Sequence, residues 1–324
     1  MVMAQSLFKQ LRSEQPALTI DVLAPSWCLP LLERMPEIRR GIDVGMGHGE
    51  FGLLARRKLG KQLQSEAYSR AIILPRSLKA ALVPFFARIP ERIGFRGEYR
   101  YGLLTDMRPF DPTYLNQTVK RFIALGLPRG AAIGSIPQPS MRVDPGQQDR
   151  LFDKFGMDRS RDTVALAPGA EYGPAKRWPA VRFGELARRL AESEINVAIL
   201  GSAKEQAIGE EIHTVADHPL VKNLCGRTEL VDTVDILGNS VVTVSNDSGL
   251  LHVAAAVGTH VVAIYGSSTP DFTPPLTDKA DIVYERIDCS PCFKRVCPLQ
   301  HFNCMQAIST SSVEHTVRQR LTNG

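Results

Sequence analysis

The sequence VSNDSGLLHVAAA, residues 244–256, decides the fold class of this chain. A β-branched run ends there in a small polar turn and an alanine-rich segment follows, which predicts a strand, a loop and the start of a helix. In an open α/β sheet, ligands bind beyond the carboxyl ends of the strands, where the first N–H groups of a helix attract anions. We therefore expect Asp247, Ser248 and Gly249 to face a ligand. The alternative is an ordinary helix with Asp or Ser as N-cap and Gly249 allowing tight packing.

A second strand and loop lie earlier in the chain. Residues 163–167 are predicted as a strand, and PGAEYGPAKRWP (168–179) follows as a loop that includes Gly169. Pro179 suits the first turn of a helix, so Lys176 and Arg177 precede a helix N-terminus. Two cations there are unfavourable unless an anion such as a diphosphate lies between them. The pattern favours a phosphate ligand, and the alternative is solvated charge on a surface loop.

A third loop, LGSAKE (200–205), follows the apolar run of residues 196–200. Its Glu205 is a candidate to accept hydrogen bonds from the diol of a ribose. Taken alone, Glu205 is better explained as an acid in the first turn of a helix.

These loops resemble those of the ADP-heptose:lipopolysaccharide heptosyltransferases, glycosyltransferase family nine, and most of all its type II members. The resemblance also covers IYGSSTPDFTPPL (264–276) and, in the N-terminal half, MAQSLFKQLR (3–12), APSWCLPLLERMPE (24–37) and residues 79–106. It spans nearly the whole chain, and a generic nucleotide-binding fold does not require these loops in this order.

The resemblance implies an α/β fold of GT-B architecture, with the acceptor on the N-terminal domain and the nucleotide sugar on the C-terminal one. It implies that heptose passes from ADP-heptose to the first heptose of the lipopolysaccharide inner core with inversion and without a catalytic metal. Basic side chains and helix N-termini then stabilise the departing diphosphate. The donor residues are Gly169, Lys176, Arg177, Glu205, Asp247, Ser248, Gly249 and His252, with Lys176 and Asp247 as the catalytic residues.

The beginning of the chain departs from the family pattern. The resemblance implies an apolar strand and a Gly-Asp turn, whose aspartate is the general base, ahead of the helix predicted by the stripe Met3, Ala4, Leu7, Phe8 and Leu11. That aspartate is not in this sequence, so we expect the chain as printed to be inactive and the reading frame to continue upstream to it. A missing central strand also predicts unpaired strand edges in the N-terminal domain.

Composition indicates a globular, cytoplasmic protein. The 324 residues are 44% hydrophobic and 23% charged, which suits two domains with separate cores. No apolar run of about eighteen residues is present, so we expect no membrane-spanning helix. Periodicity fades in residues 133–149, and we place the boundary at 145, with an acceptor domain over 1–145 and a donor domain over 146–324.

Basic side chains concentrate in the N-terminal half. Residues 76–108 hold seven basic and three acidic side chains, and the whole chain carries a net charge of +5. Such a patch attracts acidic ligands or an anionic membrane surface, and the implied acceptor, an acidic glycolipid at the cytoplasmic face of the inner membrane, is both. No nucleic-acid partner is expected, because no such motif accompanies the charge. The candidate acceptor residues are Arg76, Lys79, Arg96 and Arg100.

Four of the six cysteines form a cluster, Cys289-x2-Cys292-x4-Cys297-x6-Cys304. In a cytoplasmic protein this spacing indicates metal before disulfide, and four thiolates suit a closed, structural zinc site, with His301 as a substitute ligand. The alternatives are an iron–sulfur site or free thiols in a packed loop.

Two other functions stay open from the sequence. One is a noncatalytic protein that binds a sugar nucleotide. The other is a GT-B enzyme that uses another nucleotide sugar, such as a UDP-sugar epimerase. A preference for ADP over UDP compounds would separate heptosyl transfer from the latter.

Overall fold

The computed structural model describes residues 1–47 and 49–322, which divide into two compact units. The first unit ends at Pro137 and the second begins at Gln138, with Val2 alone grouped with the second. This division falls inside the stretch 133–149 and shortly before the predicted cut at 145. Residues 138–144 belong to the second unit because they bond to it: Met141 N donates to Ala256 O at 2.8 Å.

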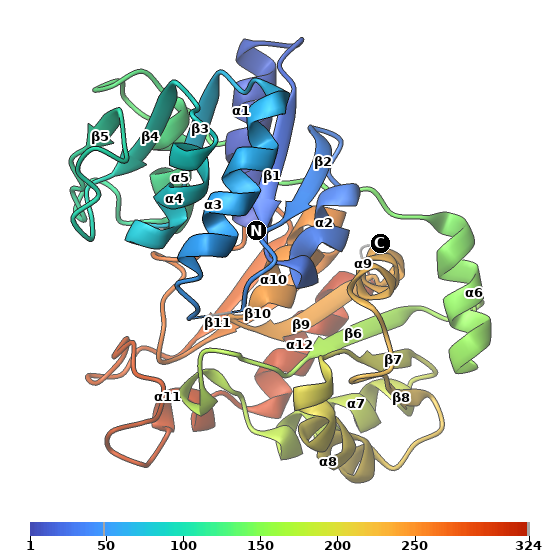
Figure 1. Ribbon diagram of the computed structural model, residues 1–324. Helices are drawn as coiled ribbons and strands as arrows, with labels where there is room; N and C mark the ends of the chain where they lie inside the picture. Colours follow the sequence, from blue (N-terminus) through green and yellow to red (C-terminus); the bar gives the residue numbers. More distant parts are fainter. Residues whose placement is uncertain (48, 323–324) are drawn as a thin grey trace. The chain divides into compact units, whose positions relative to one another are not determined.

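Among the residues that the structure describes, the first unit contains two parallel sheets instead of one (Figure 1). β1 (Ile20–Ala24) pairs with β2 (Ile38–Asp43). The other sheet has the order β3-β4-β5, made of β3 (Arg70–Ile73), β4 (Glu91–Phe95) and β5 (Asp106–Arg108). The sequence predicts unpaired strand edges in this unit, and in its described part the strands do form two separate sheets.

In the described part of this unit, five α-helices accompany these strands. They are α1 (Gln5–Glu14), α2 (Leu29–Glu33), α3 (Leu53–Gln62), α4 (Leu78–Phe86) and α5 (Thr118–Gly126). The predicted apolar stripe of α1 is buried, and α1 packs on α5, where a Cβ at Gly126 would fall 2.4 Å from Leu7 Cδ1. Short 3-10 turns lie at Val2–Ala4, Ser26–Cys28 and Leu63–Glu66.

The second unit is built on one six-stranded parallel sheet of order β11-β10-β9-β6-β7-β8. Its strands are β6 (Thr163–Ala167), β7 (Asn196–Ile199), β8 (Val221–Asn223), β9 (Val242–Asn246), β10 (His260–Tyr265) and β11 (Ala280–Tyr284). β6, β7 and β9 are buried at every position, as expected where helices cover both faces of a parallel sheet. The strand order reverses between β6 and β9, which is where doubly wound sheets bind their ligands.

The helices of this unit cover both faces of the sheet (Figure 1). They are α6 (Pro145–Phe155), α7 (Ala180–Ala191), α8 (Gln206–Ala216), α9 (Leu230–Asn239), α10 (Gly249–Val257), α11 (Asn303–Gln306) and α12 (Thr310–Leu321). Over the described residues, every helix is too short or too polar to cross a membrane.

Candidate active site

Two loops, one after β6 and one after β9, meet where the strand order reverses. Asn246, the last residue of β9, joins them. Its Nδ2 donates to Pro168 O at 2.7 Å, and its Oδ1 accepts from Trp178 N at 3.0 Å. A single buried amide therefore fixes both ends of the loop that carries Lys176 and Arg177.

Lys176 and Asp247 form a largely buried ion pair at this junction. Lys176 Nζ lies 2.5 Å from Asp247 Oδ2, and the two side chains are 16% and 5% exposed. Asp247 also accepts from Ser268 Oγ at 2.6 Å and from Thr273 Oγ1 at 3.1 Å, both in the segment after β10. Asp247 therefore accepts hydrogen bonds from three side chains that lie on two other loops. Sequence reasoning placed a ligand anion beside Lys176, and here the Asp247 carboxylate takes that position.

The N-terminus of α10 has no side-chain cap. Ser248 occupies the N-cap position, but its side chain makes no capping hydrogen bond, and the Asp247 carboxylate is turned toward Lys176. A Cβ at Gly249 would meet no described atom within 4 Å, so this glycine borders open space instead of tight packing. The alternative of an ordinary capped helix is right about Ser248 as N-cap but wrong about the capping hydrogen bond and the tight packing at Gly249, so the positive end of α10 is available to an anion.

Two buried nitrogens near this junction have no partner among the described residues, Arg177 Nε and His252 Nδ1. Burial lowers the pKa of His252 to about 4, although the nearby Asp247 carboxylate acts in the opposite direction. The imidazole is therefore neutral at pH 7. An unpaired buried polar atom lowers the stability of the fold, so both nitrogens indicate a ligand that supplies the missing hydrogen-bond partners.

Glu205 lies at the end of the 3-10 turn Ala203–Glu205, just after β7. Its Oε2 accepts from Ser202 N at 2.7 Å and from Ser202 Oγ at 3.0 Å, in a capping box. Glu205 is therefore an acid in the first turn of a helix, as the sequence taken alone indicates. The same carboxylate lies against the first loop, because a Cβ at Gly169 would fall 1.7 Å from Glu205 Oε1. Gly169 is the residue that lets the two loops approach.

Sequence reasoning did not single out Tyr172, Asn246, Ser268 or Thr273. Ser268 and Thr273 lie within residues 264–276, a stretch that carries the resemblance, but the partner of a hydroxyl group cannot be identified before the loops are placed. The Tyr172 ring is 5.3 Å from Lys176 Nζ and 5.5 Å from the Arg295 guanidinium carbon. Tyr172 therefore connects Lys176 with the cysteine-rich segment, residues 289–304.

The cysteine-rich segment is bonded to the loop that carries Lys176. Ala175 N donates to Arg295 O at 3.1 Å, Tyr172 Oη donates to Phe293 O at 2.8 Å, and Arg295 Nε donates to Tyr172 O at 2.7 Å. A Cβ at Gly173 would fall 2.3 Å from Arg295 O, so the two backbones touch there. This segment holds the shape of the Lys176 loop.

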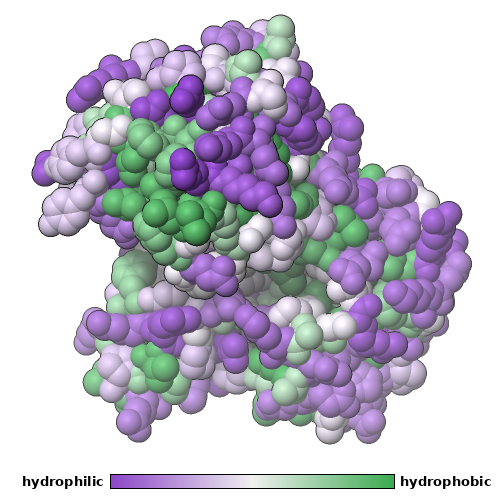
Figure 2. Space-filling model, in the orientation of Figure 1, coloured by the Kyte–Doolittle hydropathy of each residue, from purple (hydrophilic) through white to green (hydrophobic). Residues whose placement is uncertain are grey.

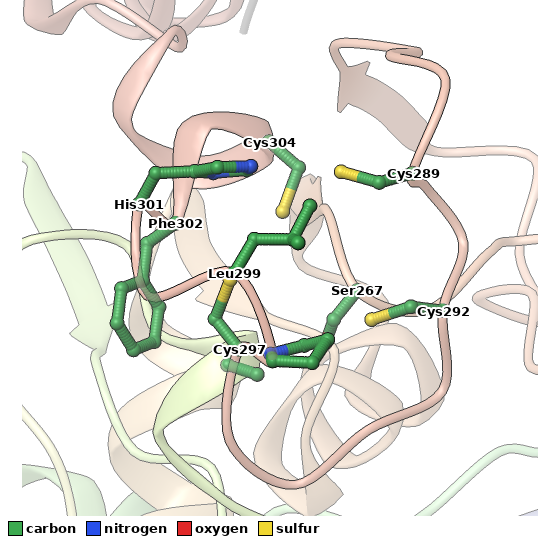
Figure 3. A pocket seen from close by; sticks show the side chains of 10 residues that line it. Ser267, Cys289, Cys292, Cys297, Leu299, His301, Phe302 and Cys304 are labelled. Carbon is green, nitrogen blue, oxygen red and sulfur yellow. The ribbon is translucent and has the colours of Figure 1, made fainter.

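Four thiols of this segment line one cavity of about 70 Å³, together with His301. Figure 3 shows the sulfur atoms of Cys289, Cys292, Cys297 and Cys304 around Leu299. Burial opposes ionisation of Cys297, but backbone N–H groups of residues 299–302 donate to its sulfur and lower its pKa. In the part of the chain that the structure describes, no three His, Cys, Asp or Glu side chains are arranged to hold a metal ion. The zinc site therefore stays a prediction.

The four candidate acceptor residues are divided between surface and interior. Arg76 and Arg96 are exposed, and Lys79 is half-buried with its Nζ 3.4 Å from Glu50 O. Arg100, in contrast, is fully buried and donates to Pro75 O at 2.8 Å and to Phe95 O. Burial lowers its pKa. The prediction that Arg100 contacts the acceptor is wrong, because backbone carbonyls of its own unit use its guanidinium.

The sheet order and the two units define an α/β protein of the GT-B class, and in its second unit the loops beyond β6, β7 and β9 lie beside the uncapped N-terminus of α10. The model of glycosyltransferase family 9 (heptosyltransferase) matches residues 56–303, and the chain belongs to this family.

Curated relatives and a solved structure agree with this assignment. The chain is 44% identical to lipopolysaccharide heptosyltransferase 2 of Escherichia coli K12, over 87% of this chain and 84% of that protein. It is also 44% identical to lipooligosaccharide heptosyltransferase 2 of Haemophilus influenzae, with the same coverage of 87% and 84%. The solved structure of E. coli ADP-heptose lipopolysaccharide heptosyltransferase II superposes with a TM-score of 0.83 at 38% identity, covering 98% of this chain and 96% of that one.

Proposed function

We propose that this chain transfers L-glycero-D-manno-heptose from ADP-heptose to the first heptose of the lipopolysaccharide inner core. The observation that supports this best is the buried Lys176–Asp247 pair beside the uncapped N-terminus of α10, in a member of the heptosyltransferase family. Its 44% identity to a type 2 enzyme over 84% of that enzyme's length favours the second heptose transfer.

In this proposal the donor lies across the loops after β6, β7 and β9. Lys176, Arg177 and the first N–H groups of α10 hold the diphosphate, since cations and a helix N-terminus both attract it. Glu205, with Gly169 beneath it, faces the ribose. Asp247, Ser248, Gly249 and His252 surround the heptose and the adjoining phosphate.

During transfer, the bond between C1 of the heptose and the diphosphate oxygen breaks. The acceptor hydroxyl oxygen bonds to C1 from the opposite face and gives its proton to a base. The resemblance assigns that base to the aspartate of a Gly-Asp turn, and the proposal gives the role to none of the residues described above. The developing charge on the diphosphate is stabilised by Lys176, which can exchange Asp247 for the phosphate, and by α10.

The acceptor side of the proposal rests on the first unit. The exposed Arg76 and Arg96, with Lys79 nearby, suit the acidic groups of an inner-core glycolipid, and contact with the cytoplasmic face of the inner membrane follows from where such a lipid lies.

Calorimetry with ADP and UDP tests the donor site without requiring turnover. We expect ADP to bind more tightly than UDP, and Lys176→Ala to weaken ADP binding by about 1.5–3 kcal/mol, the range for hydrogen bonds to charged groups. Lys154→Ala removes an exposed cation of α6 and serves as the matched control with unchanged affinity. Tighter binding of UDP would favour the alternative of an enzyme that uses another nucleotide sugar. If Lys176→Ala leaves ADP affinity unchanged, the diphosphate binds somewhere other than this loop.

A further inference from the structure

The start of α3 exposes large apolar side chains that no part of the proposed donor site uses. Phe51, Leu53 and Leu54 are 51%, 45% and 77% exposed. Figure 2 shows apolar surface gathered on this part of the first unit, bordered by hydrophilic side chains over α3. A contiguous exposed apolar surface with a polar border is typical of an interaction site.

Cations continue the same helix face. Arg57, Lys58 and Lys61 are exposed, and they follow Leu54 at spacings of three, four and seven residues, so they share its side of the helix. Arg56 and Gly60 are buried on the opposite side. None of the three cations forms an ion pair with any other described residue, unlike Arg39, Arg40 and Arg70 of the same unit. We call this surface the α3 face, comprising Phe51, Leu53, Leu54, Arg57, Lys58 and Lys61.

The net charge of the first unit agrees with the charge of this face. Residues 1–137 contain 20 Lys and Arg and 11 Asp and Glu, a net charge of +9. Since the whole chain carries +5, residues 138–324 carry −4. The unit that exposes the α3 face is therefore the one drawn toward an anionic surface.

We propose that the α3 face docks on the surface of a bilayer that contains anionic lipids. The apolar side chains at the start of α3 enter the headgroup region, while the three unpaired cations lie at the lipid phosphates. A helix that combines a short apolar end with cations suits the interface of a membrane rather than its interior. The inference rests on the proposed function for one point, that the glycolipid acceptor lies in such a bilayer.

Co-sedimentation of the full chain with phospholipid vesicles that contain no glycolipid tests the proposal. We expect binding to vesicles of phosphatidylethanolamine with about 30% phosphatidylglycerol, weaker binding to phosphatidylcholine vesicles, and loss of binding at high salt. The double variant Leu53→Glu/Leu54→Glu should lower partition onto the anionic vesicles by about tenfold or more. Val181→Glu/Ile282→Glu is the matched control, because it makes the same charge change at two apolar side chains of the second unit that are 48% and 42% exposed and lie outside the cysteine-rich segment.

Several results would overturn the proposal. Wild-type protein that stays in the supernatant, equal binding to both lipid compositions, or equal loss in the test and control variants would each do so. Dimerisation of the wild type, abolished by Leu53→Glu/Leu54→Glu without any vesicle binding, would assign the α3 face to a second copy instead. ADP affinity, measured on each variant, confirms folding and separates this test from that of the donor site.

Discussion

The Asp247 carboxylate accepts from Lys176 and Ser268 at Oδ2 and from Thr273 at Oδ1, and its side chain is 5% exposed. Such a group is strongly held, because removing one partner of a buried ion pair leaves an uncompensated charge and costs about 3–5 kcal/mol. The sequence predicted that Asp247 and Lys176 belong to one site. Their direct contact could not be predicted, because it depends on how Asn246 fixes the loop after β6.

His252 makes stability sensitive to acid. Its pKa is about 4 in the folded chain against 6.5 for an ordinary histidine, so between these values the unfolded chain binds more protons. Stability should therefore be fully present above pH 6.5 and decline as the pH falls toward 4. We expect the urea midpoint to drop between pH 7 and pH 5, and His252→Gln to reduce that drop. His315→Gln, at an exposed position of α12, should leave the pH dependence unchanged. If the urea midpoint falls with pH by the same amount in the wild type and both variants, other groups cause the acid sensitivity.

At the scale of elements, the strand–loop–helix units were predictable because hydrophobic pattern and turn residues are local. β6, β9, α7 and α10 lie where the sequence places them, although Pro179, predicted for the first turn of α7, is its N-cap residue. The contact of the cysteine-rich segment with the Lys176 loop was not predictable. It joins residues more than a hundred positions apart, mostly through backbone groups that carry no sequence signal.

Arg295 should act as a positioning residue for the Lys176 loop. Arg295→Ala removes the hydrogen bond to Tyr172 O and the stacking on the Tyr172 ring, and we expect ADP binding to weaken by about 1 kcal/mol. Arg295→Lys should recover part of that loss, because it keeps the cation over the ring. Lys294→Ala, at the neighbouring exposed position, is the control. If Arg295→Ala and Lys294→Ala bind ADP equally well, the loop is held by the backbone contacts alone.

The cysteine-rich segment also carries the zinc prediction. Four thiols around one cavity need only local movement to converge, and each loop that they would close is short. We expect protein purified without chelator to contain about one equivalent of zinc or iron, and removal of the metal to lower the melting temperature. Cys297→Ser should lose the metal, whereas Cys225→Ser, at a buried thiol outside the cluster, should retain it. If the protein contains less than about a tenth of an equivalent of zinc or iron and all four thiols titrate freely, the cysteines only pack within the loop.

For the whole molecule, composition and the loss of periodicity in residues 133–149 predicted two units, whereas the GT-B architecture and the interrupted sheet of the first unit were implied by the resemblance. Sequence reasoning failed at Arg100, where a charge count cannot distinguish an exposed guanidinium from one that donates to Pro75 O and Phe95 O inside the fold. Charge also differs between the units, +9 in residues 1–137 and −4 in the remainder. In the proposed function the anionic donor binds to the more acidic unit, so Lys176, Arg177 and the α10 N-terminus must supply the local attraction.

The open space at Gly249 bears on how this gene tolerates mutation. Apart from its two chain neighbours and the backbone of α10, no described atom lies within 4 Å of a Cβ placed there, so alanine or serine would leave packing intact. The added side chain would nevertheless occupy the volume in front of α10. An allele with either residue should yield normal amounts of folded protein in the cell while failing to complement loss of the gene, so protein abundance alone would not reveal the defect.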